Sequence, residues 1–311
     1  MNISSKNRLL SMLLVTLLLF SCQSNPDKAK TSERNESSAI DSKSSEEENE
    51  IKAVLERILI AVGNRDVQEL SALTFDQAII GWSYLKDGIW LNKELTIEEY
   101  LSNISAIEHP KPISETAIEY TISITKGRIA TVELPTIISQ FGVARSEEVN
   151  HFTMMKENDQ WKLLSVAWTV HRIPEVEREF DLNLFAQGYA QVWGSQRPEF
   201  VAMFFEEEGA LQVNDGEPAI GRNAISKVAQ SFMTKFPDIN VRFDSLAHKP
   251  NGIEFHWTLT GTDADPGGNN HKVKVSGFEL WTMSEGNLIK DSKGTFSSEE
   301  YNRQLEFGID N

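Results

Sequence analysis

The apolar positions of this chain follow a helical period first and a strand period afterwards, and this order occurs twice. Residues 51–62 are apolar at helical spacing, so they predict a helix with one apolar face that ends at Gly63-Asn64. Beyond it the period shortens to that of strands, apart from a helical stretch at 96–107. The strand-like stretches are 78–82, 116–125, 128–141, 147–157 and 160–171. Helices followed by a run of antiparallel strands are the order of an α+β domain.

A break at Ile173-Pro174 precedes a second copy of this pattern, because proline disfavours the continuation of a strand. The second copy opens with a helical face that includes Tyr189 and Trp193, and a longer helix begins after Gly221. The remaining predicted elements are a short helix at 198–205 and strands at 210–213, 239–247, 252–262, 271–283 and 287–292. The chain is therefore predicted to contain two α+β domains, at residues 46–173 and 175–308.

The N-terminus reads as an export signal at residues 1–21. Lys6 and Arg8 precede an apolar run from Leu9 to Phe20. That run of about twelve residues is too short to span a bilayer as a stable helix. Leu19-Phe20-Ser21-Cys22 resembles a bacterial lipobox, in which the signal peptidase cuts before a diacylated cysteine. The resemblance implies an exported protein of the cell envelope whose acylated Cys22 is its membrane anchor; the alternative is an ordinary secretory signal with an incidental cysteine.

Residues 22–45 are rich in Ser, Asn, Lys, Asp and Glu. Such a segment cannot bury enough apolar surface to fold, so we expect a disordered tether between the signal and the folded body. The acidic residues at 46–50 then stand where a helix N-terminus favours negative charge.

Composition excludes several classes of function. The chain has 311 residues, enough for about two domains, and a formal charge of −16, which argues against nucleic acid as a partner. One cysteine allows no intramolecular disulfide, and the six histidines show no ligand-like spacing. Asp263, Asp265 and Asn269 lack the regular spacing of a calcium loop. We therefore expect neither a metal nor a cofactor.

The second predicted domain carries a series of landmarks in a recognisable order and spacing. They are Gly216, Pro218, Gly221-Arg222, Ile225, Phe236-Pro237-Asp238, Gly261-Thr262, Glu285–Asp291 and Gln304-Leu305. Together they resemble the SnoaL-like branch of the NTF2-like superfamily, and the predicted hairpin at 150–165 resembles other NTF2-like domains. The resemblance implies that each domain is a curved antiparallel sheet wrapped over helices, with a conical cavity between them.

The acid/base positions that this resemblance implies hold no usable acid. The carboxylate of the polyketide cyclases would fall at Phe296, Ser297 or Ser298, and the base of the ketosteroid isomerases would fall near Gln212. Asp215 lies close to the second position, but with the following glycine it reads as a turn residue. A catalyst would therefore need a carboxylate in an unfamiliar place.

Alternation along two strands predicts which side chains face the second cavity. In 252–262 the face that includes Trp257 should meet the helices. In 271–283 strict alternation places Val275 and Phe278 on opposite faces of the strand. A bulge near Ser276-Gly277 would turn both side chains to the same face. The predicted ligand pocket is then lined by Tyr189, Trp193, Phe232, Trp257 and Phe278. The alternative is that these aromatic side chains simply fill the core. In the first domain Trp82, Trp90, His151 and Trp168 could line a second pocket, but we expect them to be core residues.

Asp291 and His256 are the candidates for proton transfer. Asp291 would be a usable acid if it faced inward from the last strand, where burial would raise its pKa; the alternative is an ordinary surface aspartate. Histidine is a common residue for proton transfer, but alternation places His256 with Glu254 on the face away from the helices. There it would face solvent or a dimer partner.

Three functions from different classes follow. The leading one is a lipid-anchored, non-catalytic envelope protein that binds a small, largely apolar molecule. The second is a cyclase-type or isomerase-type enzyme that uses Asp291 or His256. The third is a structural module whose sheet faces pair within the chain or in a homodimer. An open pocket with an inward carboxylate favours the enzyme, an open pocket without one favours binding, and a filled cavity favours the structural role.

Overall fold

The computed structural model describes residues 26–108, 110–265 and 268–309, with side chains from Ser45 onward. The predicted signal and Cys22 lie outside the described residues. The chain divides into two compact units between Glu46 and Glu47, and both sheets belong to the second unit. No helix in the described part of the chain is long and apolar enough to cross a membrane.

Helix α1 (Pro26–Asn64) begins inside the segment that was predicted to be a disordered tether. Proline is favoured in the first turn of a helix, because its missing N–H would have no helical partner there. A helix also satisfies most of its backbone groups internally whatever its side chains are. The first buried side chain on the described part of α1 is Ile51. The structure thus differs from the tether prediction at residues 26–45, and along the part of α1 whose side chains are described, apolar packing begins at Ile51.

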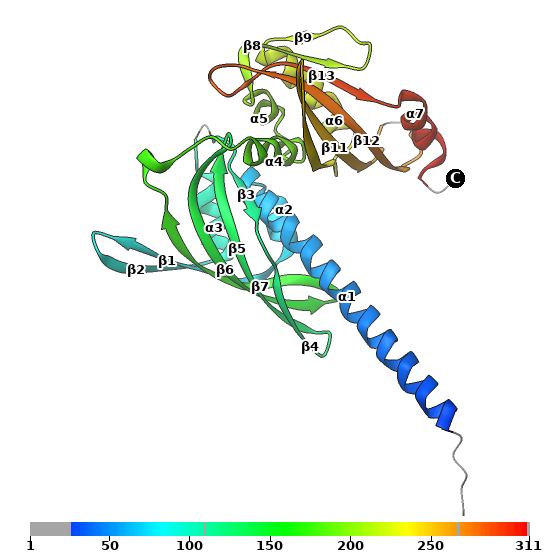
Figure 1. The fold of residues 1–311 in the computed structure, drawn as a ribbon. Helices are drawn as coiled ribbons and strands as arrows, with labels where there is room; N and C mark the ends of the chain where they lie inside the picture. The colour runs from blue at the N-terminus through cyan, green and yellow to red at the C-terminus, as the bar shows by residue number, and fades with distance from the viewer. Residues whose placement is uncertain (1–25, 109, 266–267, 310–311) are drawn as a thin grey trace, which may run out of the picture. The chain divides into compact units, whose positions relative to one another are not determined.

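The first sheet follows α1 and a short helix. Its elements are α2 (Val67–Leu73), β1 (Thr74–Lys86), β2 (Ile89–Thr96), α3 (Ile97–Ser105), β3 (Ser114–Ala117), β4 (Thr121–Thr125), β5 (Ile129–Gln140), β6 (Val143–Glu157) and β7 (Gln160–Arg172). The strand order is β2-β1-β7-β6-β5-β3, with β4 also paired to β5 (Figure 1). β1 and β7 are parallel and the other pairs antiparallel. A core of apolar residues from α1, α2, β5, β6 and β7 lies inside this curved sheet.

The second sheet repeats the plan. Its elements are η1 (Glu175–Glu177), α4 (Leu182–Trp193), α5 (Pro198–Ala202), β8 (Phe205–Val213), β9 (Ala219–Ile220), α6 (Arg222–Lys235), β10 (Asn240–Lys249), β11 (Gly252–Thr262), β12 (Lys272–Met283), β13 (Ile289–Phe296) and α7 (Ser298–Phe307). The strand order is β10-β11-β12-β13-β8-β9, with β13 and β8 parallel (Figure 1). The apolar faces of α4, α5 and α6 pack into the hollow of this sheet.

Local chemistry explains where the two main helices of this sheet begin. The Asp181 side chain accepts hydrogen bonds from the backbone N–H groups of Asn183 and Leu184, so it caps α4. Gly221 precedes α6 at φ +80°, a left-handed conformation that glycine adopts without strain. Both helices carry aromatic side chains toward the sheet, which places the site described next.

The α+β class predicted from the sequence is confirmed, with two mixed sheets that each pack against helices. The structure differs in detail. Strand β2 was not expected, and Phe205, placed in a short helix by its spacing, begins strand β8.

Candidate functional site

The site is built on strand β12, and its register corrects the sequence prediction. β11 and β12 pair without interruption from Ile253↔Trp281 to Thr262↔Lys272, so no bulge interrupts this pairing. Alternation therefore continues, and Glu279 faces inward while Phe278 faces outward. Phe278 lies against the His256 ring, with ring centroids 5.6 Å apart. The prediction that Phe278 lines the cavity was wrong.

A glycine makes the uninterrupted register possible. Gly277 lies opposite Trp257 in the sheet. A Cβ at Gly277 would lie 2.8 Å from Trp257 Cζ2 and 2.5 Å from the Thr295 carbonyl oxygen. The indole ring thus covers the space where a side chain would stand, and the strand keeps its regular pleat.

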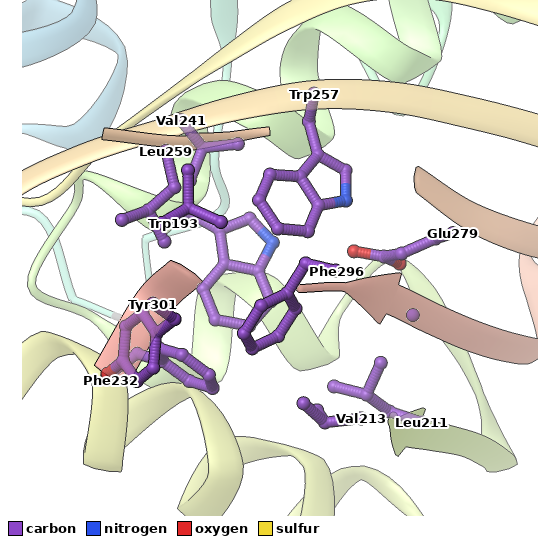
Figure 2. Close-up of a pocket in the computed structure, with 12 residues that line it drawn as sticks. Trp193, Leu211, Val213, Phe232, Val241, Trp257, Leu259, Glu279, Phe296 and Tyr301 are labelled. Carbon is purple, nitrogen blue, oxygen red and sulfur yellow. The ribbon is translucent and has the colours of Figure 1, made fainter. Parts of the chain in front are cut away.

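A small cavity lies between this sheet and the helices. Its volume is about 50 Å³. It is lined by Trp193, Leu211, Val213, Phe232, Val241, Trp257, Leu259, Val275, Glu279, Gly294, Phe296 and Tyr301 (Figure 2). All of these except Glu279 and Gly294 are aromatic or aliphatic, so the cavity is apolar with a single carboxyl group in its wall.

Three neutral donors hold the Glu279 carboxyl group. Ser292 Oγ donates to Oε2 at 2.6 Å, and Trp281 Nε1 donates to the same oxygen at 3.0 Å. Tyr189 Oη lies 3.1 Å from Oε2 and 3.4 Å from Oε1. Oε1 is therefore the less occupied oxygen of a side chain that is only 6% exposed.

The electrostatics of the site follow from burial. Burial raises the pKa of Glu279, while the hydrogen bonds from Ser292, Trp281 and Tyr189 act in the opposite direction. Burial and the adjacent Glu279 raise the pKa of the Tyr189 hydroxyl well above its ordinary value, so this group remains a donor. No Lys, Arg or His of the described chain forms an ion pair with Glu279. The site can therefore hold a proton at a carboxyl group inside an apolar wall.

Trp257 supplies a second polar group. Its Nε1–H is buried and has no hydrogen-bond partner among the described residues. The indole ring borders the cavity together with Trp193 and Phe296 (Figure 2). A buried donor without a partner costs free energy, and a molecule in the cavity that carries an acceptor would relieve that cost.

The other predicted site residues separate into two groups. Trp193, Phe232 and Trp257 line the cavity. Tyr189 is fully buried and does not line the cavity, but its hydroxyl group donates a hydrogen bond to the Glu279 carboxyl group.

The two predicted proton-transfer residues lie away from the cavity. Asp291 is half-buried, and its neighbour Ser292 is the residue of β13 that reaches Glu279. The structure thus agrees with the alternative of an ordinary aspartate outside the cavity, and Asp291 is not the inward acid that the enzyme hypothesis needs. His256 Nε2 lies 3.1 Å from the Glu254 carboxylate on the outer face, as alternation indicates.

The positions named by the family resemblance hold no acid in the structure either. Phe296 lines the cavity, whereas Ser297 caps α7 by accepting the Glu300 N–H. Gln212 donates to the Gly216 carbonyl oxygen. Across the described residues no group of three or more His, Cys, Asp or Glu side chains is arranged to hold a metal.

Sequence reasoning missed Glu279. One signal was present, since Val273, Val275, Glu279 and Trp281 share a single alternating phase with Gly277 between them. Phe278 is apolar although it faces outward, so it suggested that a bulge changes the alternation.

Comparison with known proteins finds a family model that matches the second half of the chain. Residues 183–296 match the model of the SnoaL-like polyketide cyclase family, which confirms the resemblance for the second α+β half. No curated protein matches the chain in sequence.

Solved structures with a similar fold include three bacterial proteins. A hypothetical protein with a ketosteroid isomerase-like fold from Catenulispora acidiphila is 15% identical, covers 38% of this chain and 88% of its own, and gives a TM-score of 0.34. A putative polyketide cyclase from Xanthomonas campestris is 17% identical over 38% of this chain and 91% of its own, with a TM-score of 0.34. An NTF2-like protein from Shewanella baltica is 20% identical over 42% of this chain and 96% of its own, with a TM-score of 0.32.

Proposed function

We propose that the SnoaL-like half of this chain binds a small, largely apolar molecule in the cavity beside Glu279, on a protein anchored in the bacterial cell envelope through Cys22. One observation carries the proposal: two residues that line an apolar cavity have incompletely hydrogen-bonded polar groups, which are Glu279 Oε1 and Trp257 Nε1. Apolar ligand sites in proteins have this composition, with a few placed polar groups that fix the ligand's orientation.

Both groups lower the stability of a purely structural core. Burying a carboxyl group costs free energy even when it is hydrogen-bonded, and an apolar residue of similar shape avoids that cost. A bound ligand would offset this cost, because Glu279 Oε1 can donate a hydrogen bond to a polar atom of the ligand or accept one from it. Trp257 Nε1–H can donate to a second atom.

The size of the cavity limits how the ligand enters. About 50 Å³ holds a few water molecules but is smaller than the space of an aromatic ring. Phe232, Phe296 and Tyr301 line it and are only half-buried. We expect these three side chains to move outward when a ligand enters, while the buried Trp257 and Glu279 remain in place.

The anchor rests on the sequence alone. The lipobox-like residues 19–22 follow an apolar run that is too short to span a bilayer. An acylated Cys22 would hold the protein at a membrane by its lipid chains. Cys22→Ala should then accumulate as uncleaved precursor; normal processing and detergent-sensitive membrane attachment of this variant would contradict the anchor.

Mass spectrometry of material extracted from the purified protein tests the binding proposal. The wild-type chain and Gly294→Ala are purified from the native host in parallel. A Cβ at Gly294 would lie 3.6 Å from Glu279 Cγ, an ordinary contact, so the variant fills part of the cavity without strain. A molecule that is retained by the wild type and depleted in Gly294→Ala supports binding. Equal recovery from both, or no retained molecule in either, counts against it.

The inward carboxyl group favours a second candidate, acid–base catalysis on a small cyclic substrate. Burial raises the pKa of the Glu279 carboxyl group, so this group can hold a proton and pass it to a substrate. Hydrogen–deuterium exchange next to the carbonyl group of cyclohexanone, followed by NMR in heavy water, detects such proton transfer. Exchange that requires the protein and is lost in Glu279→Gln would establish catalysis; binding without exchange would exclude it for this probe.

A further inference from the structure

The hairpin formed by β1 and β2 exposes an unusual number of large apolar side chains at its tip. Leu85 is 53% exposed, Ile89 65%, Trp90 58% and Leu91 37%. The hairpin extends away from the rest of its sheet (Figure 1), and β2 is the last strand on that edge. Trp90 was expected to be a core residue, so its exposure is a correction.

Apolar side chains occupy both faces of the hairpin tip. Leu85 and Trp90 are paired across the two strands and therefore lie on one face. Ile89 and Leu91 alternate with Trp90 and lie on the other face. A protein partner that docks on one face would leave the other in water. A lipid bilayer into which the tip inserts would cover both faces at once.

The charged residues near the tip are also compatible with a lipid bilayer. Residues 84–93 contain Lys86, Lys93 and Asp87, so this segment carries one net positive charge in a chain whose formal charge is −16. Both lysines are exposed. Lysine side chains can place their ammonium groups among lipid headgroups while their methylene stems lie along apolar surface. Tryptophan, with an apolar ring and one N–H donor, is enriched at the same depth of a bilayer.

We propose that the tip of this hairpin, residues 84–93, inserts into the headgroup–acyl boundary of a lipid bilayer. Leu85, Ile89, Trp90 and Leu91 enter the apolar side of the boundary, and the two lysines contact anionic headgroups. One such tip is a weak membrane ligand by itself. Acylation of Cys22, which belongs to the proposed function, would raise the effective concentration of the tip at the surface. The tip's insertion is independent of the pocket around Glu279.

A second copy of this chain is the competing occupant. The outer edge of β2 is free in the described chain, and an exposed apolar edge strand can pair with another edge. Pairing of this kind would produce a dimer in the absence of lipid. The oligomeric state without vesicles therefore separates the two occupants.

Depth-dependent fluorescence quenching tests the proposal on the full chain. The purified protein is reconstituted into vesicles of phosphatidylcholine with a minority of phosphatidylglycerol, in which the acyl chains of the phosphatidylcholine are brominated or unmodified. Trp90→Phe removes the proposed reporter. Trp82→Phe is the matched control, because Trp82 belongs to the same hairpin but stacks on Trp168 with ring centroids 5.5 Å apart.

Brominated lipid should quench the wild type and Trp82→Phe, and the quenched component should disappear in Trp90→Phe. This readout does not depend on how the protein reached the vesicle, so it stands apart from the Cys22 proposal. Quenching that is unchanged in Trp90→Phe would overturn the proposal.

A second pair of variants measures insertion without relying on one ring. Ile89→Ser combined with Leu91→Ser should abolish the vesicle-induced hydrogen-exchange protection of residues 84–93. Val176→Ser, at an apolar side chain that is 95% exposed elsewhere, should leave it unchanged. A wild-type dimer by light scattering in lipid-free buffer that becomes monomeric in the Ile89/Leu91 variant would also overturn the proposal, because it would assign the tip to a second copy.

Discussion

Each of the two sheets buries one glutamate, and the two glutamates have different surroundings. Glu115 of β3 is 7% exposed and Glu279 of β12 is 6% exposed. Neither forms an ion pair within the described chain, and both are held by neutral donors. Both halves thus keep a carboxyl group inside an α+β core without a charged partner among the described residues.

The surroundings of Glu115 are polar. Thr136 Oγ1 donates to its Oε1 at 2.9 Å and Asn150 Nδ2 donates to the same oxygen at 3.1 Å. Burial raises the pKa of Glu115 to about 7. Burial, followed by the effect of Glu115, also raises the pKa of Glu148 to about 7. This half therefore holds two coupled acids beside buried hydroxyl and amide groups.

The surroundings of Glu279 are aromatic. Two of its three donors, Tyr189 and Trp281, are aromatic side chains, and the carboxyl group borders an apolar cavity. The match to the SnoaL-like family also covers only this half, within residues 183–296. The two buried glutamates therefore differ in the residues that surround them. The combination of such a group with an apolar cavity is the informative feature.

Truncation of a tryptophan in each half should have the largest effect. Trp193 and Trp161 are 7% and 3% exposed. Trp193→Ala and Trp161→Ala should each lower the free energy of unfolding by about 3–5 kcal/mol, because both rings are packed. Urea unfolding of each variant measures this. A clearly smaller loss for Trp193→Ala would mean that its ring borders open space, which would make the pocket larger than the static cavity.

Glu115 should make the stability of the protein depend on pH. A glutamate whose folded pKa is raised binds its proton more tightly in the folded state, so stability falls as pH rises from the unfolded pKa to the folded one. For Glu115 this window runs from 4.5 to about 7. The loss should be on the order of 2–3 kcal/mol.

Glu115→Gln should flatten the decline between those pH values, and urea unfolding at several pH values measures it. Glu147→Gln, at an exposed residue on β6, is the control and should leave the slope unchanged. An unchanged slope in Glu115→Gln would show that the carboxyl group is ionised in the folded state throughout this range.

Two glycines of the second sheet should respond differently to an added methyl group. A Cβ at Gly277 would lie 2.5 Å from the Thr295 carbonyl oxygen, so Gly277→Ala should cost about 1–3 kcal/mol. The nearest atoms to a Cβ at Gly294 lie at 3.4 and 3.6 Å, and Gly294→Ala should change stability by less than about 0.5 kcal/mol. Thermal unfolding of the pair checks the register of β12. Equal costs would contradict the close approach of Trp257 to Gly277.

The sequence predicted the elements better than the site. The strand at 160–171 was located within a residue or two because the turn residues Asn158-Asp159 precede it and Pro174 follows it. Strand β2 was missed because Ile89, Trp90 and Leu91 are consecutive apolar residues without alternation. That pattern is explained by a hairpin with no core on either face.

Glu279 was missed for a related reason. An apolar residue normally indicates the inner face of a strand, and Phe278 therefore suggested that the phase of β12 changes. The outer face of this sheet is itself partly apolar, because Phe278 packs on His256 there. The pairing of Gly277 with Trp257 keeps the phase of β12 unchanged at this point, and that pairing is a long-range contact.

Calorimetric titration with naphthol, a small aromatic molecule with one hydroxyl group, tests the central claim most directly. Wild type, Glu279→Gln and Glu115→Gln are compared at the same pH. The account predicts that the wild type binds and that Glu279→Gln weakens binding by about tenfold or more, as expected for the loss of a buried charged or strongly polar contact. It also predicts that Glu115→Gln binds like the wild type. Equal affinity of all three proteins, or a loss confined to Glu115→Gln, would contradict the assignment of the site to Glu279.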